Sequence, residues 1–177
     1  MKNRLKWSML TLVLAVFFHL VTVAFLPRAI MAVVSKKALR SLNVSVNTAV
    51  HQPPVSADQK TVVMPCPDLL YTLCVYDVSR RPLRIKTPAP DDTYFSIAMY
   101  ASNTDNFFVV NDRMLSRGGK EIILIKKGSS YPHPGKDEIV EAPTSTGIIL
   151  GRTLITDENK MSEITQIQHQ IKITQIQ

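Results

Sequence analysis

A carboxylate and a phenol lie close together in the sequence at Asp68 and Tyr71, and such a pair can do acid–base chemistry when it converges in a pocket. The two residues are three positions apart, so in a β-strand their side chains would point to opposite faces of the sheet. The preceding Pro65-Cys66-Pro67 segment favours a turn, which would take Asp68 out of the strand. The sequence therefore offers one candidate acid–base pair, on the condition that Asp68 lies in this turn.

A second group of polar residues surrounds two strand-like segments between residues 93 and 110. Oxygen ligands on adjacent loops can hold calcium, which takes about six to eight of them at roughly 2.3–2.6 Å. Asp and Asn are also the residues that accept backbone hydrogen bonds in tight turns, and no EF-hand spacing is present, so we interpret the group as turn residues. Its members are Asp91, Asp92, Asn103, Asp105, Asn106, Asn111, Asp112 and Arg113.

The histidines and cysteines show no metal-ligand spacing. His51, His133 and His169 are far apart in the sequence, and Cys66 and Cys74 do not form a CxxC pair. No GxSxG, Walker or GxGxxG motif occurs either, so we predict no metal and no cofactor. The two cysteines are either a disulfide, which an oxidising compartment would permit, or two free, packed thiols.

A charge-free apolar run occupies residues 7–26. Its 20 residues rise about 30 Å as a helix, which matches the hydrocarbon thickness of a bilayer. Pro27-Arg28 is expected to end the segment, and the apolar patch at residues 29–34 either extends the helix or lies in the membrane interface. A cleavable signal peptide is the alternative, but the run is longer than the usual 7–15 apolar residues and lacks a small-x-small cleavage site. We therefore predict an uncleaved anchor.

Positive charge is concentrated at the start of the chain. The first 40 residues contain seven Lys or Arg and no acidic residue, which equals the formal net charge of +7. Residues 41–177 hold 14 basic and 14 acidic residues. A body without net charge lacks the clustered positive face that nucleic-acid phosphates require, whereas basic residues beside an apolar run attract anionic lipid head groups. We predict membrane lipid as a partner through residues 7–26, and no nucleic acid.

The body of the chain has the texture of a β protein. Short β-rich segments at intervals near ten residues, separated by Pro, Gly, Asp and Asn, predict an antiparallel sandwich or barrel rather than a parallel α/β sheet. In the segment 83–87, Leu83 and Ile85 alternate with Arg84 and Lys86, as in a half-buried strand. The predicted strands are residues 61–64, 69–78, 83–87, 93–101, 107–110, 121–127 and 147–154.

The last segment changes to a helical period. Thr156 can cap a helix whose first turn holds Asp157 and Glu158, which favours the positive end of the helix dipole. An amphipathic helix that packs on the sheet, followed by a polar tail, is expected, with an apolar face made of Met161, Ile164, Ile167 and Ile171. The whole chain then divides into a basic tail and transmembrane anchor at 1–34, a stalk or linker at 35–60, a β domain at 61–155, and a C-terminal helix and tail at 156–177.

Several short motifs in the body occur together. They are Asn47, His51 and Pro53; Thr61-Val62-Val63; Pro65-x-Pro67-Asp68-Leu69-Leu70-Tyr71; Pro90-Asp91-Asp92-Thr93-Tyr94-Phe95-Ser96; and Asn103-Thr104-Asp105-Asn106-Phe107-Phe108. Over roughly residues 40–155 the chain resembles the domain-of-unknown-function family 1254, in particular its short membrane-anchored bacterial form. The resemblance implies a β-sandwich of jelly-roll type and no established reaction.

Two functions remain open at this point. The first is a non-enzymatic binding module, exposed on the periplasmic side of the bacterial inner membrane by a single-pass anchor, with an envelope protein or glycan as partner. The second is a small envelope enzyme that acts on carbohydrate with Asp68 and Tyr71 in a cleft of the sandwich. We favour the module because no catalytic signature is present. By motif position, the candidate ligand-binding residues are Asp68, Tyr71, Asp92 and Asn106.

Overall fold

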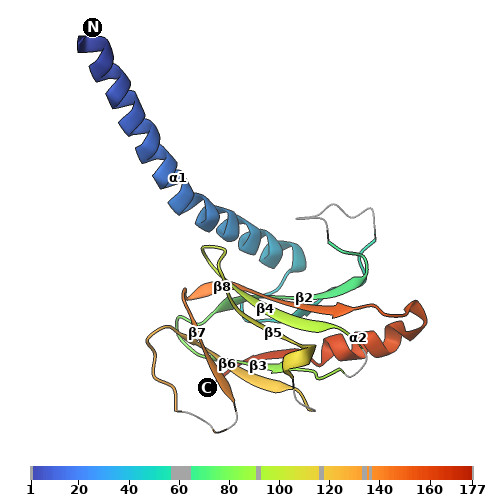
Figure 1. The fold of residues 1–177 in the computed structure, drawn as a ribbon. Coiled ribbons are helices and arrows are strands. Elements are labelled where there is room, and N and C mark those ends of the chain that lie inside the picture. The colour runs from blue at the N-terminus through green and yellow to red at the C-terminus, as the bar shows by residue number, and fades with distance from the viewer. Residues whose placement is uncertain are drawn as a thin grey trace.

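The structure is a computed structural model that describes residues 2–56, 65–90, 93–115, 118–132, 135 and 137–176. It consists of a long N-terminal helix, two β-sheets and a short C-terminal helix (Figure 1). The strand predicted at residues 61–64, together with Asp91 and Asp92, lies outside the described residues.

Helix α1 runs from Lys2 to Leu42, so residues 29–34 extend the helix beyond Pro27, which is one of the two alternatives that the sequence left open. Proline removes the backbone donor that would bond to the carbonyl of Val23, four residues earlier, and its ring crowds this turn, to which the carbonyl of Ala24 also belongs. The guanidinium of Arg28 donates a hydrogen bond to the Ala24 carbonyl. The helix bends partway along its length instead of stopping (Figure 1). Residues 3–42 form a helix that is long and apolar enough to cross a membrane.

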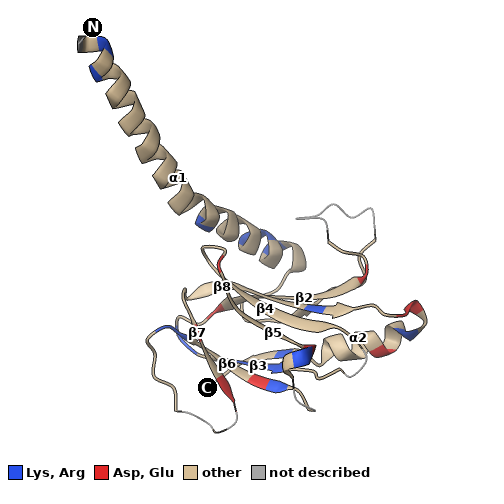
Figure 2. Ribbon diagram, viewed as in Figure 1, with Lys and Arg blue, Asp and Glu red and all other residues tan. Residues whose placement is uncertain are grey.

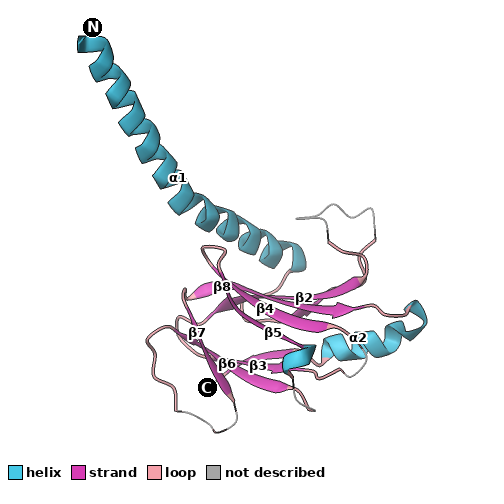
Figure 3. Cartoon of the chain, viewed as in Figure 1, coloured by secondary structure: helices cyan, strands magenta, loops and turns pink. Residues whose placement is uncertain are grey.

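The first sheet has five strands, all antiparallel to their neighbours, in the order β1-β2-β8-β4-β5 (Figure 3). The central pair, β2 and β8, is in register over nine residues, from Leu69 opposite Leu154 to Asp77 opposite Thr146. The strands are β1 (Val50–His51), β2 (Leu69–Asp77), β8 (Thr146–Leu154), β4 (Phe95–Ala101) and β5 (Asn106–Asn111).

The second sheet has four strands in the order β7-β6-β3-β9. Its β6–β7 pair is parallel, which departs from the wholly antiparallel arrangement that the sequence predicted. The strands are β7 (Glu138–Ala142), β6 (Lys120–Lys126), β3 (Leu83–Thr87) and β9 (Lys172–Gln175).

One hydrophobic core joins the two sheets. Along β2, Cys74 and Tyr76 point into it, and from β3 Leu83 and Ile85 do so with no exposed surface, as the alternation in that segment predicted. Because strands of both sheets contribute to the same cluster, the sheets form two packed layers. The predicted mainly β body is therefore confirmed as two sheets around a shared core, one of them mixed and not antiparallel throughout, whereas the jelly-roll connectivity stays a prediction.

The C-terminal segment differs from its prediction. A short 3-10 turn at Glu158–Lys160 leads into α2 (Met161–His169), and the chain then forms β9, which pairs with β3. Ile171 and Ile173 are buried at a spacing of two, so they belong to an extended segment and not to the helix face. The predicted amphipathic helix is consequently shorter, and its buried side chains are Ile164 and the polar Gln168.

Candidate functional site

Asp68 lies in a turn immediately before β2, as the proline pattern predicted, and Tyr71 lies near the start of β2. The Tyr71 hydroxyl accepts a hydrogen bond of 2.9 Å from the backbone N–H of Cys66, whose sulfur lies 3.9 Å from a carboxylate oxygen of Asp68. The backbone carbonyl of Asp68 accepts a 2.8 Å hydrogen bond from the N–H of Ile155, which ties the turn to the end of β8. These contacts give the Tyr71 phenol a turn-closing role and leave the Asp68 side chain exposed.

Asn106 lies at the other end of the same sheet. It opens β5 opposite Tyr100, beside the β4 residue Ala101 that pairs with Gly147 at the beginning of β8. Nine residues of β2 separate that end from Asp68, and nine residues of strand span about 30 Å. Asp68 and Tyr71 therefore both contact Cys66, Asn106 lies apart from them, and the fourth candidate, Asp92, is outside the described residues.

The other Asp and Asn side chains serve turns where the structure describes them. The Asn103 amide donates to the Asp105 carboxylate, and the Asp105 N–H donates back to Asn103 Oδ1 at 3.4 Å. Between them, Thr104 has a φ of 75°, a conformation that such side-chain bonds help to hold. At the opposite end, Asp112 accepts a 3.4 Å bond from the N–H of Phe95. Within the described part of the chain, no three His, Cys, Asp or Glu side chains gather closely enough to hold a metal ion.

The two cysteines are free thiols in different surroundings. Cys66 is exposed in the turn before β2, whereas Cys74 has 1% of its surface exposed and lies in the core. Burial raises the pKa of the Cys74 thiol to about 12, against the opposing effect of a backbone hydrogen bond from Asn47. Cys74 is accordingly an inert packing residue, and Cys66 is the accessible thiol.

A histidine pair that the sequence pattern missed joins β1 to α2. The rings of His51 and His169 stack with their centroids 4.5 Å apart and an angle of 23° between their planes. The Nδ1 atom of His51 also lies 3.0 Å from the hydroxyl oxygen of Thr72 on β2. Burial lowers the pKa of His51, and the charge of His169 lowers it further. The two residues are so far apart in the sequence that no spacing rule could have paired them.

Gln168 fixes the helix beside this pair. Its side chain is 2% exposed, and its amide donates to the carbonyls of Gln52, at 3.0 Å, and Tyr71, at 2.9 Å. The N–H of Gln52 also donates to the Tyr71 carbonyl at 2.8 Å. One buried amide thus links α2 to the chain after β1 and to β2, and it holds the neighbouring His169 in place.

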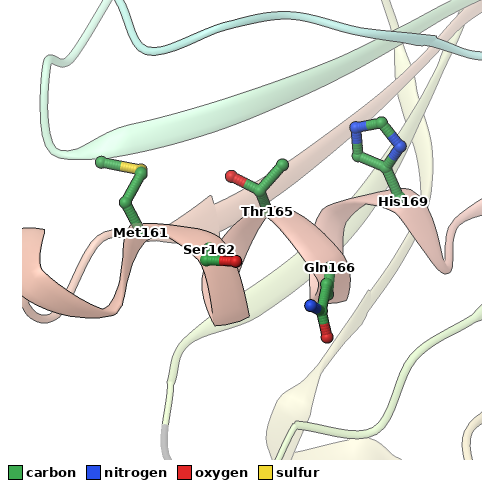
Figure 4. A pocket seen from close by; sticks show the side chains of 5 residues that line it. All are labelled: Met161, Ser162, Thr165, Gln166 and His169. Carbon is green, nitrogen blue, oxygen red and sulfur yellow. The ribbon is translucent and has the colours of Figure 1, made fainter.

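The exposed side of α2 forms a shallow depression of about 370 Å³ (Figure 4). Met161, Thr165 and His169 project to the same side of the helix in this view, as residues four apart do. Hydroxyl, amide and imidazole groups give this surface hydrogen-bond donors and acceptors beside the apolar Met161 side chain. The lining residues are Met161, Ser162, Thr165, Gln166 and His169.

A second depression, of about 330 Å³, lies beside β3 and β6. It includes Gly119, where an added Cβ would come within 2.0 Å of the carbonyl oxygen of Thr87. Asp68 and Tyr71 line neither depression. The lining residues are Lys86, Thr87, Gly118, Gly119, Lys120, Glu121, Gln170 and Lys172.

Comparison with known proteins gives a fold and a family but no activity. No curated protein matches the chain. The VPA0106 protein from Vibrio parahaemolyticus, a solved structure, is similar with a TM-score of 0.71 and 14% identity over 87% of this chain. A putative uncharacterized protein from Burkholderia cenocepacia aligns with a TM-score of 0.49 and 19% identity over 75% of the chain.

This chain spans about a third of the length of these two proteins, since the alignments cover 36% of each. The family model described as "Protein of unknown function (DUF1254)" matches residues 46–175, which take in both sheets, α2 and β9. The resemblance carried by the turn and strand motifs is thereby confirmed, and it extends beyond the predicted end at residue 155. The chain belongs to the DUF1254 family.

Proposed function

We propose that this protein is a binding module, held by α1 on the periplasmic face of the bacterial inner membrane, and that the exposed side of α2 binds an envelope protein or glycan. The observation that carries the proposal is the division of α1 into two parts. Residues 3–26 are all exposed, whereas half-buried residues recur from Met31 onward and the helix contacts strands β2 and β8. The domain is therefore continuous with a segment suited to a membrane.

The exposed apolar part supports the anchor. Trp7, Phe17 and Phe18 are 69%, 56% and 61% exposed, and large apolar side chains on every side of the helix are similarly open. A helix that is apolar all round needs an apolar environment, and the described part of the domain does not supply one. A bilayer does, and residues 7–26 match its thickness.

The α2 surface supports binding rather than catalysis. His169 is the ionisable residue among the five that line it, so the surface lacks the carboxylate partners of common acid–base sites. A shallow surface also leaves its groups in water, where hydrogen bonds to sugar hydroxyls or peptide amides give recognition without chemistry. The enzyme alternative has less support because the Tyr71 hydroxyl closes a turn and Asp68 lies in the open.

The difference between the two cysteines provides a test of orientation. A membrane-impermeant maleimide is added to intact spheroplasts that express the full-length protein. We expect labelling, because Cys66 is exposed. The variant Cys66→Ser is the control, and it should stay unlabelled because Cys74 is buried. Labelling of Cys66 only after the membrane is permeabilised would place the domain in the cytoplasm and overturn the localisation.

A site-specific crosslinker tests the binding surface. A photoreactive residue replaces Gln166 on the α2 surface, and in a matched control it replaces the exposed Ser129 after β6. After irradiation of intact cells, we expect a discrete adduct from position 166 that is absent at position 129 and is reduced by Thr165→Arg. Adducts from position 166 that match those from position 129, or that Thr165→Arg leaves unchanged, would contradict binding at this surface.

A further inference from the structure

The second part of α1 has two chemically different faces, and the domain covers one of them. Residues 28–42 follow Pro27 and form the part of α1 that lies beside the first sheet, whose strands β2 and β8 the helix contacts (Figure 1). Within this segment the half-buried side chains recur at spacings of one, three and four, which places them on one face of the helix. They are Met31, Val34, Ser35, Ala38, Leu39 and Leu42.

The outer side of the first sheet is apolar where this helix lies. Val75 on β2 and Ile148 on β8 point away from the shared core, because their neighbours Cys74 and Ile149 point into it. Even so, Val75 and Ile148 are only 7% and 8% exposed. The helix therefore packs as a third layer on the outer side of this sheet, and its axis is fixed relative to the domain.

The opposite face of the helix combines positive charge with exposed apolar side chains. With about 100° between successive residues, Lys36, Lys37 and Arg40 lie roughly half a turn away from the buried face. All three are exposed. Nearer the bend, Ile30 and Val33 are 51% and 65% exposed on that side. Figure 2 shows blue residues at the start of α1 and along this second part, with no red residue on the helix.

We propose that residues 28–42 lie in the head-group layer of the membrane that residues 7–26 enter, with the basic face bound to the phosphates of anionic lipids. This inference rests on the proposed anchoring. A helix with apolar and basic residues on one face has the composition of an interfacial helix, and it begins where the membrane-spanning part ends. The segment would then lie between the lipid surface and the first sheet, so that the outer side of this sheet faces the membrane.

Other occupants fit this face less well. Nucleic acid requires a broad positive surface, but the body of the protein has equal numbers of basic and acidic residues. A protein partner would have to approach a helix that is joined directly to the membrane anchor. Each cation near an anionic surface strengthens docking by about fivefold, so three cations together contribute on the order of 100-fold.

A depth-sensitive label tests the proposal in the full-length protein. The variant Val33→Cys is combined with Cys66→Ser and labelled with an environment-sensitive fluorophore. The labelled protein is reconstituted into nanodiscs of phosphatidylcholine, either alone or with about 30% phosphatidylglycerol. We expect blue-shifted emission and quenching by brominated lipids in the anionic discs, and weaker effects in the neutral ones. The charge reversal Lys36→Glu/Lys37→Glu/Arg40→Glu should remove the difference between the two lipid compositions.

The matched control reverses three exposed lysines in or next to the second sheet, Lys126→Glu/Lys127→Glu/Lys172→Glu, and should leave the label in its lipid environment. An equal loss in this control, or a label that stays in water in both lipids, overturns the inference. Burial of the label that depends on the number of proteins per disc, and not on lipid charge, would also overturn the inference, because it would show that a second copy of the chain covers this face. Protein that never enters the discs would instead contradict the anchor itself, so the two failures are distinguishable.

Discussion

The stacked histidines are the residues whose chemistry responds most directly to pH. The pKa of His51 is lowered from its ordinary value of 6.5 by burial and then by the charge of His169. Its unfolded form therefore binds a proton at a higher pH than its folded form does. The stabilising effect of the neutral ring is complete above about pH 6.5 and is lost as the pH falls from there through the folded pKa.

We therefore expect the free energy of unfolding to decrease from pH 7.5 to pH 5.5, as measured by urea denaturation in detergent. The variant His51→Gln removes the titrating group and should show a smaller decrease over the same range. Other groups titrate in this range too, so the informative quantity is the difference between the two proteins. An identical pH dependence in both would show that the pair has no role in acid stability.

Gln168 gives a prediction about a buried hydrogen bond. The variant Gln168→Met keeps a side chain of similar volume but cannot donate to the carbonyls of Gln52 and Tyr71. A buried polar group left without its partner costs about 1–3 kcal/mol, so we expect a loss of that size in the free energy of unfolding. The exposed neighbour Gln166→Met, on the same helix, should change it by less than about 0.5 kcal/mol.

At the scale of single elements, β9 is the part of the fold that contradicts the sequence most clearly. Ile173 is 9% exposed in a strand that pairs with β3, whereas the sequence predicted a polar tail after the helix. The variant Ile173→Ala should therefore reduce the free energy of unfolding by about 2–4 kcal/mol, as expected for a buried isoleucine. Gln175→Ala, at an exposed position of the same strand, is the control. Equal stability of the two variants would mean that the tail is not part of the core.

Local patterns predicted the elements whose own residues determine them. The strict alternation in Leu83–Thr87 placed β3 correctly, and most of the other predicted strands agree to within about two residues. The turn at Asp68 also followed from local chemistry, because proline and Asp restrict the backbone there. These features depend on residues that are neighbours in the sequence, so local patterns are enough to predict them.

The features that were missed depend on distant partners. β1 has only two residues and exists because β2 lies beside it, and β9 forms because β3 offers an edge for Ile173. The stacking of His51 on His169 could not be predicted for the same reason, since β1 and α2 meet only in the folded chain.

At the scale of the whole molecule, the chain combines a two-layered β body with a helix whose two parts differ in chemistry. The part of α1 at residues 28–42 is amphipathic and covers the first sheet, while residues 7–26 are apolar all round. A soluble protein would bear a heavy cost for so much exposed apolar surface, because monomers rarely expose large contiguous apolar patches. Partition of this helix into a membrane, as we propose, would remove the cost.

The position of charges along α1 makes this argument testable. Leu14 and Phe18 lie near the middle of residues 7–26 and are 45% and 61% exposed. The double variant Leu14→Arg/Phe18→Arg would place two cations at the bilayer centre, at a cost of about 5–7 kcal/mol on the translocon scale. We expect most of this variant to leave the membrane fraction on alkaline carbonate extraction, while the wild type stays in it.

The matched variant Ser8→Arg/Leu26→Arg adds the same charge at the two ends of the span, where arginine side chains reach the interface. It should remain with the membrane like the wild type, because only depth distinguishes the two variants. Extraction of both variants to the same extent would indicate attachment by charge or by a partner protein. If both variants stay in the membrane fraction as the wild type does, the domain itself holds the protein at the membrane. The proposal that the helix is the anchor would then be wrong.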